Sequence, residues 1–348
     1  MSTLLFIDSF DHYSTAQITR KWTSMSNASI VTSPVRTGTQ AMQGGGGTFA
    51  YKTFGASYPE LTAGAAYQVN GFNNYMLVFQ NTPAGLTFYL QQVGDGRLQL
   101  YFSYGGQSVT SPPSTFVMAI NRWYYFEIQA TVTGGPPASV NATAQANGVN
   151  IITWTGTLSS AGLAGLQFNA VGLGGPGGGY SATVDDFYCT DTEYLGDVKI
   201  GVLYPFTPLG DTVQWSPSTV AAANYTMVNE HVADDDTTYN KAASTGLKDL
   251  YHLDQISPTF TGPIKGAQAL WCVKKSDSGS ATVQGGWKSG ATEIDQSHGD
   301  NYTPPNGFSP SYTDYLYNRQ AERNSLFTSS PWTVAEINGL QLGIIRTT

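Results

Sequence analysis

Residues 85–106 read GLTFYLQQVGDGRLQLYFSYGG, and this stretch predicts the fold of the chain. Two runs in which apolar and polar residues alternate, 86–93 and 97–104, flank the segment Val93-Gly94-Asp95-Gly96. Alternation with period two is typical of a half-buried strand, and glycine supplies the positive φ angles that a tight hairpin turn needs. The stretch therefore predicts an antiparallel β-hairpin.

The same alternating pattern continues along the chain, where Gly, Pro, Asn or Asp interrupts short runs of β-branched and aromatic residues. Aromatic residues inside these alternating runs are expected in the core. We predict an all-β chain whose single helical turn begins near Pro331, with Ser330 as N-cap and a closing strand at 340–347. The other expected elements are strands at 3–8, 48–54, 74–80, 123–132 and 139–147 and a hairpin over 267–290.

The composition excludes several classes of protein. Charged residues make up 11% of the chain, against about 25% in an average globular protein. With 16 basic and 24 acidic residues the net charge is −8, and no basic cluster is longer than Lys274-Lys275, so nucleic acid is not an expected partner. The apolar fraction of 41% is ample for a folded core.

The first residues, MSTLLFIDSFDHY, lack a basic segment and hold only a short apolar run. Such a segment is too short for a signal peptide or a membrane span, so no membrane insertion is expected. Cys189 and Cys272 lie far apart in apolar runs and are expected as buried thiols, which suits folding in a reducing cytosol.

The sequence offers little that predicts catalysis. Its four histidines lie in no catalytic motif, and no cluster of His and Cys has the spacing of a metal site, so neither an enzyme nor a cofactor is expected. Glu293 and Asp295 would share one face of a strand, as in glycosidases that carry paired acids. His298 stands where a third acid would follow, and a polar edge strand is the favoured interpretation. A glycan depolymerase that uses Glu293 with Asp295, or the acids at 185–197, is the alternative.

The stretch SATVDDFYCTDTEYLGDVKI, residues 181–200, is rich in carboxylates. On a regular strand Asp185 and Asp186 point to opposite faces and cannot form a catalytic pair. We predict that this strand closes the first sandwich with one or two carboxylates on its rim. Asp191, Glu193 and Asp197 are assigned to the linker that follows.

Two groups in the second half are weaker candidates for binding. The acidic turn Asp234, Asp235 and Asp236 is a candidate for structural calcium, although an Asx turn that caps the next strand is the favoured interpretation. Aromatic residues in a segment rich in Pro, Asn and Gly are candidates for glycan or protein recognition, or cover a core edge or a subunit interface. These residues are Tyr302, Phe308, Tyr312 and Tyr315.

Several motifs together resemble a known family. DSFDHY (8–13), RTGTQAM (36–42), RWYYFEIQATV (122–132) and TVDDFYC (183–189) resemble the concanavalin A-like, or laminin G-like, jelly-roll domain of bacteriophage structural proteins. YLGDVKIGVLYP (194–205), ADDDTTYN (233–240) and PWTVAEINGLQLGI (331–344) are similar to the module that accompanies it in phage tail, fibre and minor virion proteins.

The resemblance implies a jelly roll at 1–192, a linker at 193–198 and a smaller β-sandwich-like module at 199–348. It implies a virion structural protein on the particle exterior, in a tail, a fibre or attached to the capsid, that binds host-surface glycans. Its expected partners are other virion proteins and further copies of itself, with assembly in the host cytoplasm. The alternative is a purely structural capsid decoration or head fibre protein without a ligand.

Overall fold

In a computed structural model the chain forms two compact units, residues 1–201 and 202–348. The structure describes residues 2–348 except 74, 82–83, 136, 160–165, 176–179, 221, 258–259, 261, 297–309 and 312. Both units are built almost entirely from antiparallel strands, so the prediction of an all-β chain is confirmed. The predicted linker, 193–198, lies in the last residues of the first unit.

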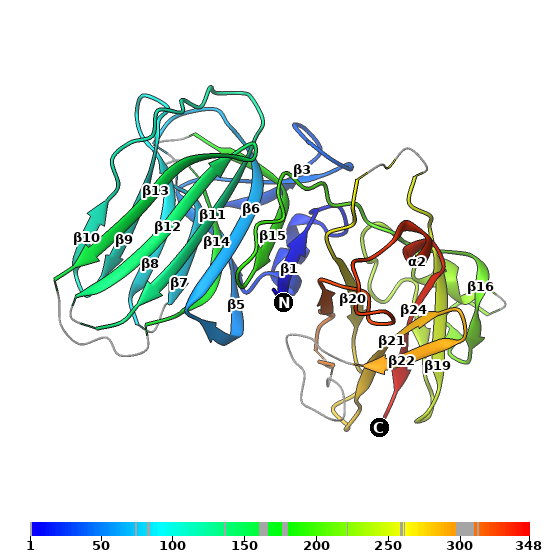
Figure 1. Ribbon diagram of the computed structural model, residues 1–348. Helices are drawn as coiled ribbons and strands as arrows, with labels where there is room; N and C mark the ends of the chain where they lie inside the picture. Colours follow the sequence, from blue (N-terminus) through cyan, green and yellow to red (C-terminus); the bar gives the residue numbers. More distant parts are fainter. Residues whose placement is uncertain are drawn as a thin grey trace. The chain divides into compact units, whose positions relative to one another are not determined.

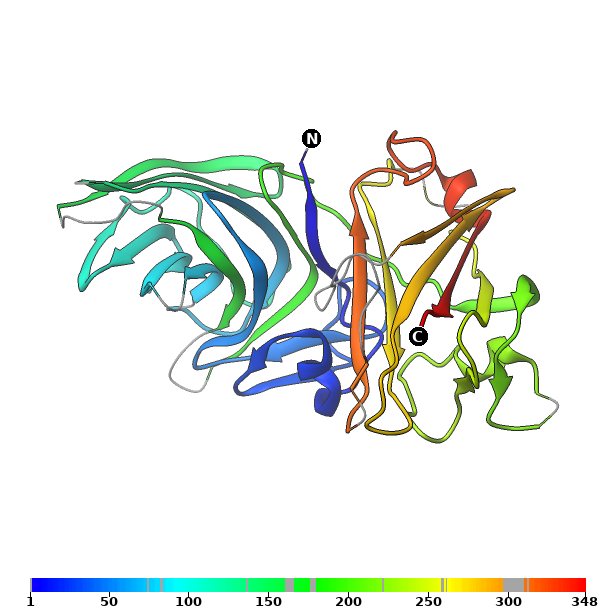
Figure 2. The ribbon, with the colours of Figure 1, turned by 90° about the horizontal axis from the view of Figure 1, so that it is seen from below.

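The first unit is a sandwich of two sheets, which Figure 1 shows face on and Figure 2 shows edge on. One sheet has the order β13 (Val149–Leu158), β12 (Ala138–Ala146), β11 (Tyr124–Thr133), β6 (Glu60–Val69), β15 (Ala182–Thr190), β4 (Ala41–Gly44), β3 (Ala28–Val31), and β1 (Leu4–Asp8) also pairs with β15. The other has the order β10 (Gln107–Thr110), β9 (Leu98–Tyr104), β8 (Leu86–Gln92), β7 (Tyr75–Asn81), β14 (Phe168–Gly175), β5 (Gly47–Tyr58), β2 (Ser24–Met25). Short helical turns, η1 (Thr15–Gln17) and α1 (Ile18–Lys21), follow β1.

The hairpin at 85–106 forms as the sequence predicts. β8 pairs with β9, and the amide of Gly96, at a φ of 83°, donates to the carbonyl of Val93 at 2.9 Å. Alternate side chains of both strands enter the core between the sheets, among them Phe88 and Phe102, which have no exposed surface. The apolar half of the alternating pattern therefore holds the two sheets together.

The second unit is built around a five-stranded sheet in the order β16 (Pro205–Val213), β19 (Lys248–Leu253), β24 (Leu340–Arg346), β21 (Val283–Ser289), β22 (Thr292–Gln296). A two-stranded ribbon, β20 (Ala267–Val273) with β23 (Leu316–Glu322), packs on this sheet. Trp271 of the ribbon donates its indole N–H to the carbonyl of Gly343 in β24 at 2.7 Å. A second small ribbon joins β17 (Ser216–Pro217) to β18 (Asn240–Lys241), with a 3-10 turn, η2 (Asn224–Met227), between them. Ala269, Trp287, Trp332, Ile337 and Leu340 form one cluster of the unit's core, and Val283 and Ile344 form another.

Two local predictions in this unit need correction. The segment 267–290 is not a hairpin, since β20 pairs with β23 while β21 pairs with β22 and β24. The predicted helical turn exists as α2 (Val334–Asn338), but its N-cap is Thr333 rather than Ser330. The hydroxyl of Thr333 accepts from the amide of Glu336 at 3.1 Å and the Glu336 carboxylate accepts from the Thr333 amide at 3.0 Å, which forms a capping box.

Candidate functional site

The outer face of the second sheet carries the polar half of the alternating pattern. Three cross-strand pairs of β8 and β9 lie on it in successive rows: Thr87 with Ser103, Tyr89 with Tyr101, and Gln91 with Gln99. All six side chains are half-buried, whereas the residues between them are buried. The expectation that aromatic residues of alternating runs enter the core is therefore wrong for Tyr89 and Tyr101.

Tyr75, from β7, extends the middle row to three tyrosines. The rings of Tyr89 and Tyr101 are stacked with centroids 4.5 Å apart, and the Tyr75 ring meets Tyr89 edge on at 4.7 Å. Burial, followed by the neighbouring Tyr75 and Tyr101, raises the pKa of the Tyr89 phenol, so this phenol is neutral at physiological pH. Contacts between aromatic rings are worth about 0.5–1.5 kcal/mol beyond their buried area, so the rings hold one another in place.

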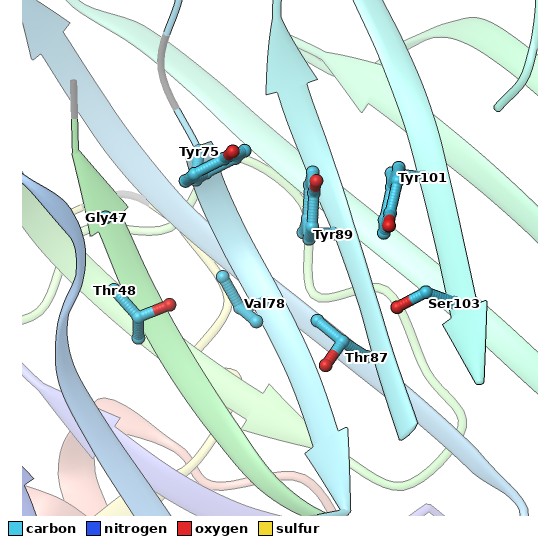
Figure 3. Close-up of a pocket in the computed structure, with 8 residues that line it drawn as sticks. All are labelled: Gly47, Thr48, Tyr75, Val78, Thr87, Tyr89, Tyr101 and Ser103. Carbon is cyan, nitrogen blue, oxygen red and sulfur yellow. The ribbon is translucent and has the colours of Figure 1, made fainter. Parts of the chain in front are cut away.

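A depression of about 280 Å³ opens beside this row. Figure 3 shows the three tyrosines as one wall and the smaller side chains of Thr48, Val78, Thr87 and Ser103 beside them. The tyrosines form one row and the smaller side chains form a second. Both rows run across the strands, since each member of a row comes from a different strand. We call this surface the tyrosine face; its members are Gly47, Thr48, Tyr75, Val78, Thr87, Tyr89, Tyr101 and Ser103.

Glycines of β14 allow the walls of the depression to approach each other. A Cβ atom on Gly172 would lie 2.9 Å from Cγ2 of Thr48, and one on Gly174 would lie 2.6 Å from the carbonyl oxygen of Tyr75. A side chain at position 172 would collide with Thr48, and one at position 174 would collide with Tyr75. The two glycines thus keep Thr48 and Tyr75 close across the strand that separates β5 from β7.

The acid-rich stretch has a different geometry from the predicted one. β15 pairs with β6 through a bulge between Asp185 and Tyr188, and Asp186 has a φ of 52°. A bulge adds a residue to one strand and re-aims its side chains, so period two does not hold here. Both carboxylates are fully buried. The predictions that Asp185 and Asp186 point in opposite directions, and that they lie on a rim, are wrong.

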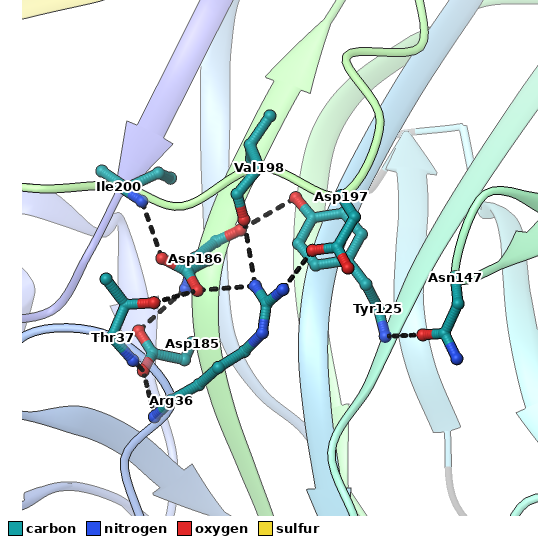
Figure 4. Close-up of polar contacts among 9 residues, drawn as sticks. All are labelled: Arg36, Thr37, Tyr125, Asn147, Asp185, Asp186, Asp197, Val198 and Ile200. Carbon is teal, nitrogen blue, oxygen red and sulfur yellow. Dashed lines mark hydrogen bonds and ion pairs between the residues drawn. The ribbon is translucent and has the colours of Figure 1, made fainter. Parts of the chain in front are cut away.

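Both carboxylates meet the segment that contains Arg36 and Thr37 (Figure 4). Oδ2 of Asp185 accepts from the backbone amides of Arg36 and Thr37 at 2.8 and 3.0 Å. Oδ2 of Asp186 accepts from the Arg36 guanidinium at 2.7 Å and from the Thr37 hydroxyl at 2.9 Å. Arg36 also forms an ion pair with Asp197. We call Arg36, Asp185, Asp186 and Asp197 the acid cluster.

The cluster also fixes the end of the first unit. The Arg36 guanidinium donates to the carbonyl of Val198 at 2.9 Å, and the amide of Ile200 donates to Oδ1 of Asp186 at 2.7 Å. Burial, followed by the neighbouring Asp186, raises the pKa of Asp185 to about 7. Burial also raises the pKa of Asp186, which has the cation beside it. The pair is enclosed by protein groups, and its role in the structure is to hold residues 197–200.

The candidate binding residues of the second half fall in two groups. Tyr302, Phe308 and Tyr312 lie outside the described residues. Tyr315 is half-buried, and its hydroxyl donates to the carbonyl of Asp235 at 3.1 Å and to the carboxylate of Asp236 at 3.0 Å. The ammonium of Lys274 lies 4.8 Å from its ring centroid. These contacts anchor the acidic turn with Tyr315.

The calcium candidates do not share one site. Oδ1 of Asp234 accepts from the amide of Thr238 at 3.0 Å, while the carboxylate of Asp236 pairs with Lys274 at 2.6 Å. Asp235 has a φ of 61°, as in a tight turn. Within the described part of the chain, no three His, Cys, Asp or Glu residues are grouped so that they could hold a metal ion.

Glu293 and Asp295 do lie together, on one face of β22. Both pair with the ammonium of Lys248, and Asp295 does so at 2.8 Å. The cation between the two acids holds them as an ion-pair network on the surface of the five-stranded sheet.

No protein-family model and no curated protein matches the sequence, but solved structures are similar to it. An alginate lyase of family PL-14 from Aplysia kurodai has 12% identity and a TM-score of 0.42, over 54% of this chain and 99% of its own. An endo-β-1,4-glucuronan lyase from Trichoderma reesei has 14% identity and a TM-score of 0.35, over 49% and 91%. The carbohydrate-binding module CBM66 of Bacillus subtilis has 13% identity and a TM-score of 0.31, over 48% and 96%.

These similarities correct the expectation that the chain is not an enzyme. Two of the three structures named above are polysaccharide lyases, so the exclusion of catalysis drawn from the histidines does not stand. At these identities and TM-scores the likeness assigns neither an activity nor a substrate to this chain. Among the described residues no helix is long and apolar enough to cross a membrane.

The tyrosine face was missed at the level of sequence, although a signal for it exists. Asp95 and Arg97 are the only charged residues between Glu60 and Arg122. A long uncharged segment whose polar positions hold Thr, Tyr, Gln and Ser indicates a surface that is polar without being ionic.

Proposed function

We propose that the tyrosine face binds glycan chains. The observation that carries the proposal is the row of Tyr75, Tyr89 and Tyr101 beside the hydroxyls of Thr48, Thr87 and Ser103 in one surface depression. Sugars present apolar C–H patches and hydroxyl groups together. Aromatic rings contact the patches, and hydroxyl side chains both donate to and accept from sugar hydroxyls.

The packing among the tyrosines favours binding. Ordering a flexible side chain at an interface costs about 0.5–1.5 kcal/mol. Tyr89 and Tyr101 are held by their mutual stack before any ligand arrives. The amides of Gln91 and Gln99, which hydrogen-bond each other at 3.2 Å, continue the polar surface on the other side of the tyrosine row. A bound chain therefore meets an ordered surface.

The test is a binding survey with soluble polysaccharides, both neutral and acidic, read by affinity electrophoresis and titration calorimetry. Tyr101→Ala should weaken binding about tenfold, since loss of a stacked ring costs of the order of 1–2 kcal/mol. Phe206→Ala, which removes an exposed aromatic residue of the second unit, is the matched control and should leave affinity unchanged. Absence of binding across the survey, or equal affinity of the Tyr101→Ala variant, would contradict the proposal.

The same mixtures are assayed for newly formed reducing ends. Release of reducing ends that is lost in Tyr101→Ala and kept in Phe206→Ala would extend the role of the face from binding to turnover. Bound glycan without such release would limit the role of the face to recognition.

The virion role remains a prediction from the motifs of the sequence. We propose on that basis a protein on the outside of a phage particle, with other virion proteins and further copies of itself as partners. Glycan binding would there serve attachment to the host surface. Mass spectrometry of purified particles and immunogold labelling test this role independently of the binding survey.

A further inference from the structure

We infer that the tyrosine face is selective for neutral glycans and discriminates against polyuronates. The inference rests on the proposed function and adds the chemical class of the ligand. It depends on a further observation, which glycan binding alone does not require: none of the residues that line the depression carries a charge.

The sheet that carries the tyrosine face is almost free of ionisable acids and bases. Strands β7, β8, β9, β10 and β14 contain no Asp, Glu, Lys or Arg. Asp95 and Arg97 lie in the hairpin turn and pair with each other at 2.6 Å. Lys52 of β5 is buried, and its ammonium donates to the carbonyl of Lys21 at 2.9 Å. Its pairing partner on β14, Val171, is a core residue, so Lys52 lies on the side of β5 away from the depression.

A uronate polymer places a carboxylate on every sugar unit, and that carboxylate must give up water on entering the depression. Neutral hydroxyl donors replace only part of that hydration, and none of the eight described residues that form the face is a cation that could compensate the charge. A neutral sugar carries a hydroxymethyl group at the same position, which the hydroxyls of Thr48, Thr87 and Ser103 match as donors and acceptors.

The charge of the whole chain acts in the same direction. The net charge is −8, which disfavours the approach of a polyanion at low ionic strength. Affinity for a neutral glycan should not depend on salt, because no ion pair forms. Affinity for a polyuronate should rise slightly with salt as the repulsion is screened.

The test uses pairs of oligosaccharides that differ only at C6. Mannohexaose is compared with the β-1,4-linked mannuronate hexamer, and cellohexaose with the β-1,4-linked glucuronate hexamer, by calorimetry on the full chain. In each pair that binds, we expect the neutral member to bind at least about tenfold more tightly, as an uncompensated carboxylate is desolvated.

A gain-of-function variant gives a second readout. Ser103→Lys adds a cation to the depression and should raise uronate affinity about tenfold at low salt, with the gain lost as salt increases. Thr133→Lys adds the same charge at an exposed position of the other sheet and should not produce the gain.

The outcomes separate the two proposals. Equal or tighter binding of the uronate member overturns the selectivity and leaves glycan binding intact. If neither these pairs nor the wider survey shows binding, while Tyr101→Ala abolishes self-association on a sizing column, the face joins copies of the chain and both proposals fail.

Discussion

The tyrosine face and the acid cluster are two outcomes of the same alternating strand pattern. In β8 and β9 the alternation runs without interruption, so Tyr89 and Tyr101 reach the surface in one row. In β15 a bulge interrupts it, and two adjacent carboxylates meet at one buried point. Two neighbouring acids of the acid-rich stretch, Asp185 and Asp186, are thus enclosed, whereas the uncharged strands β8 and β9 present their polar side chains on the outer face of their sheet.

The largest expected effect comes from removing the cation of the acid cluster. Arg36→Met leaves Asp186 buried without its ion-pair partner, which should lower the free energy of unfolding by about 3–5 kcal/mol. Chemical denaturation measures the change. Arg97→Met breaks an exposed ion pair in the hairpin turn and serves as the control, with a much smaller expected change because water screens the pair. Similar losses in the two variants would show that the acid cluster contributes no more than a surface pair.

The second effect is a pH dependence of stability that originates in Asp185. Its pKa in the folded protein is about 7, above the ordinary value of 3.8, so folding favours the protonated form. This contribution is complete below the ordinary pKa and is lost as pH rises through 7.

Compared with Asp185→Asn, the natural chain should therefore lose of the order of 4 kcal/mol of stability between about pH 4 and about pH 8, since one pKa unit corresponds to about 1.4 kcal/mol. Denaturation at a series of pH values measures the difference between the two profiles. Asp95→Asn, at an exposed carboxyl of the hairpin turn, should leave the shape of the profile unchanged over this range. Parallel profiles for the natural chain and Asp185→Asn would contradict the assignment.

The smallest expected effect is a loss of glycan affinity at the tyrosine face. Thr87→Val removes one hydroxyl from the tyrosine face and keeps the shape of the side chain. Glycan affinity should fall about three- to fivefold, since one hydrogen bond is worth about 1 kcal/mol, while stability should change little. Thr133→Val, an exposed threonine of the other sheet, is the control. A loss of stability without a loss of affinity would place Thr87 with the groups that hold the fold.

Local sequence patterns predicted the elements whose causes are local. The hairpin at 85–106 depends on alternation and on Gly96, and both lie within one short segment. α2 was expected in nearly the right place, but its N-cap was not, because Ser330 and Thr333 are both suitable capping residues. The hydrogen bonds between Thr333 and the Glu336 three residues later mark Thr333 as the cap.

The sites were harder to predict than the elements. Period two divides β8 into two sets, Phe88 with Leu90 and Thr87 with Tyr89, but an aromatic residue is compatible with either face. The phenol of tyrosine is compatible with a wet surface, and the opposing sheet of the sandwich covers only the set that contains Phe88. The sequence analysis placed the aromatic residues of both sets in the core, which is correct for Phe88 and wrong for Tyr89.

The sequence by itself determined an all-β chain, because strand alternation and turn residues act over a few neighbours. Tertiary structure alone decided which acids are buried and which aromatic residues face outward. Arg36 and Asp186 are 150 residues apart in the chain and meet only because β15 carries a bulge at that point. Tyr89 and Tyr101 are paired across β8 and β9, and Tyr75 reaches them from β7, where the register shifts between Tyr75 and Val78. Both arrangements depend on pairing between distant strands, and no local pattern encodes that pairing.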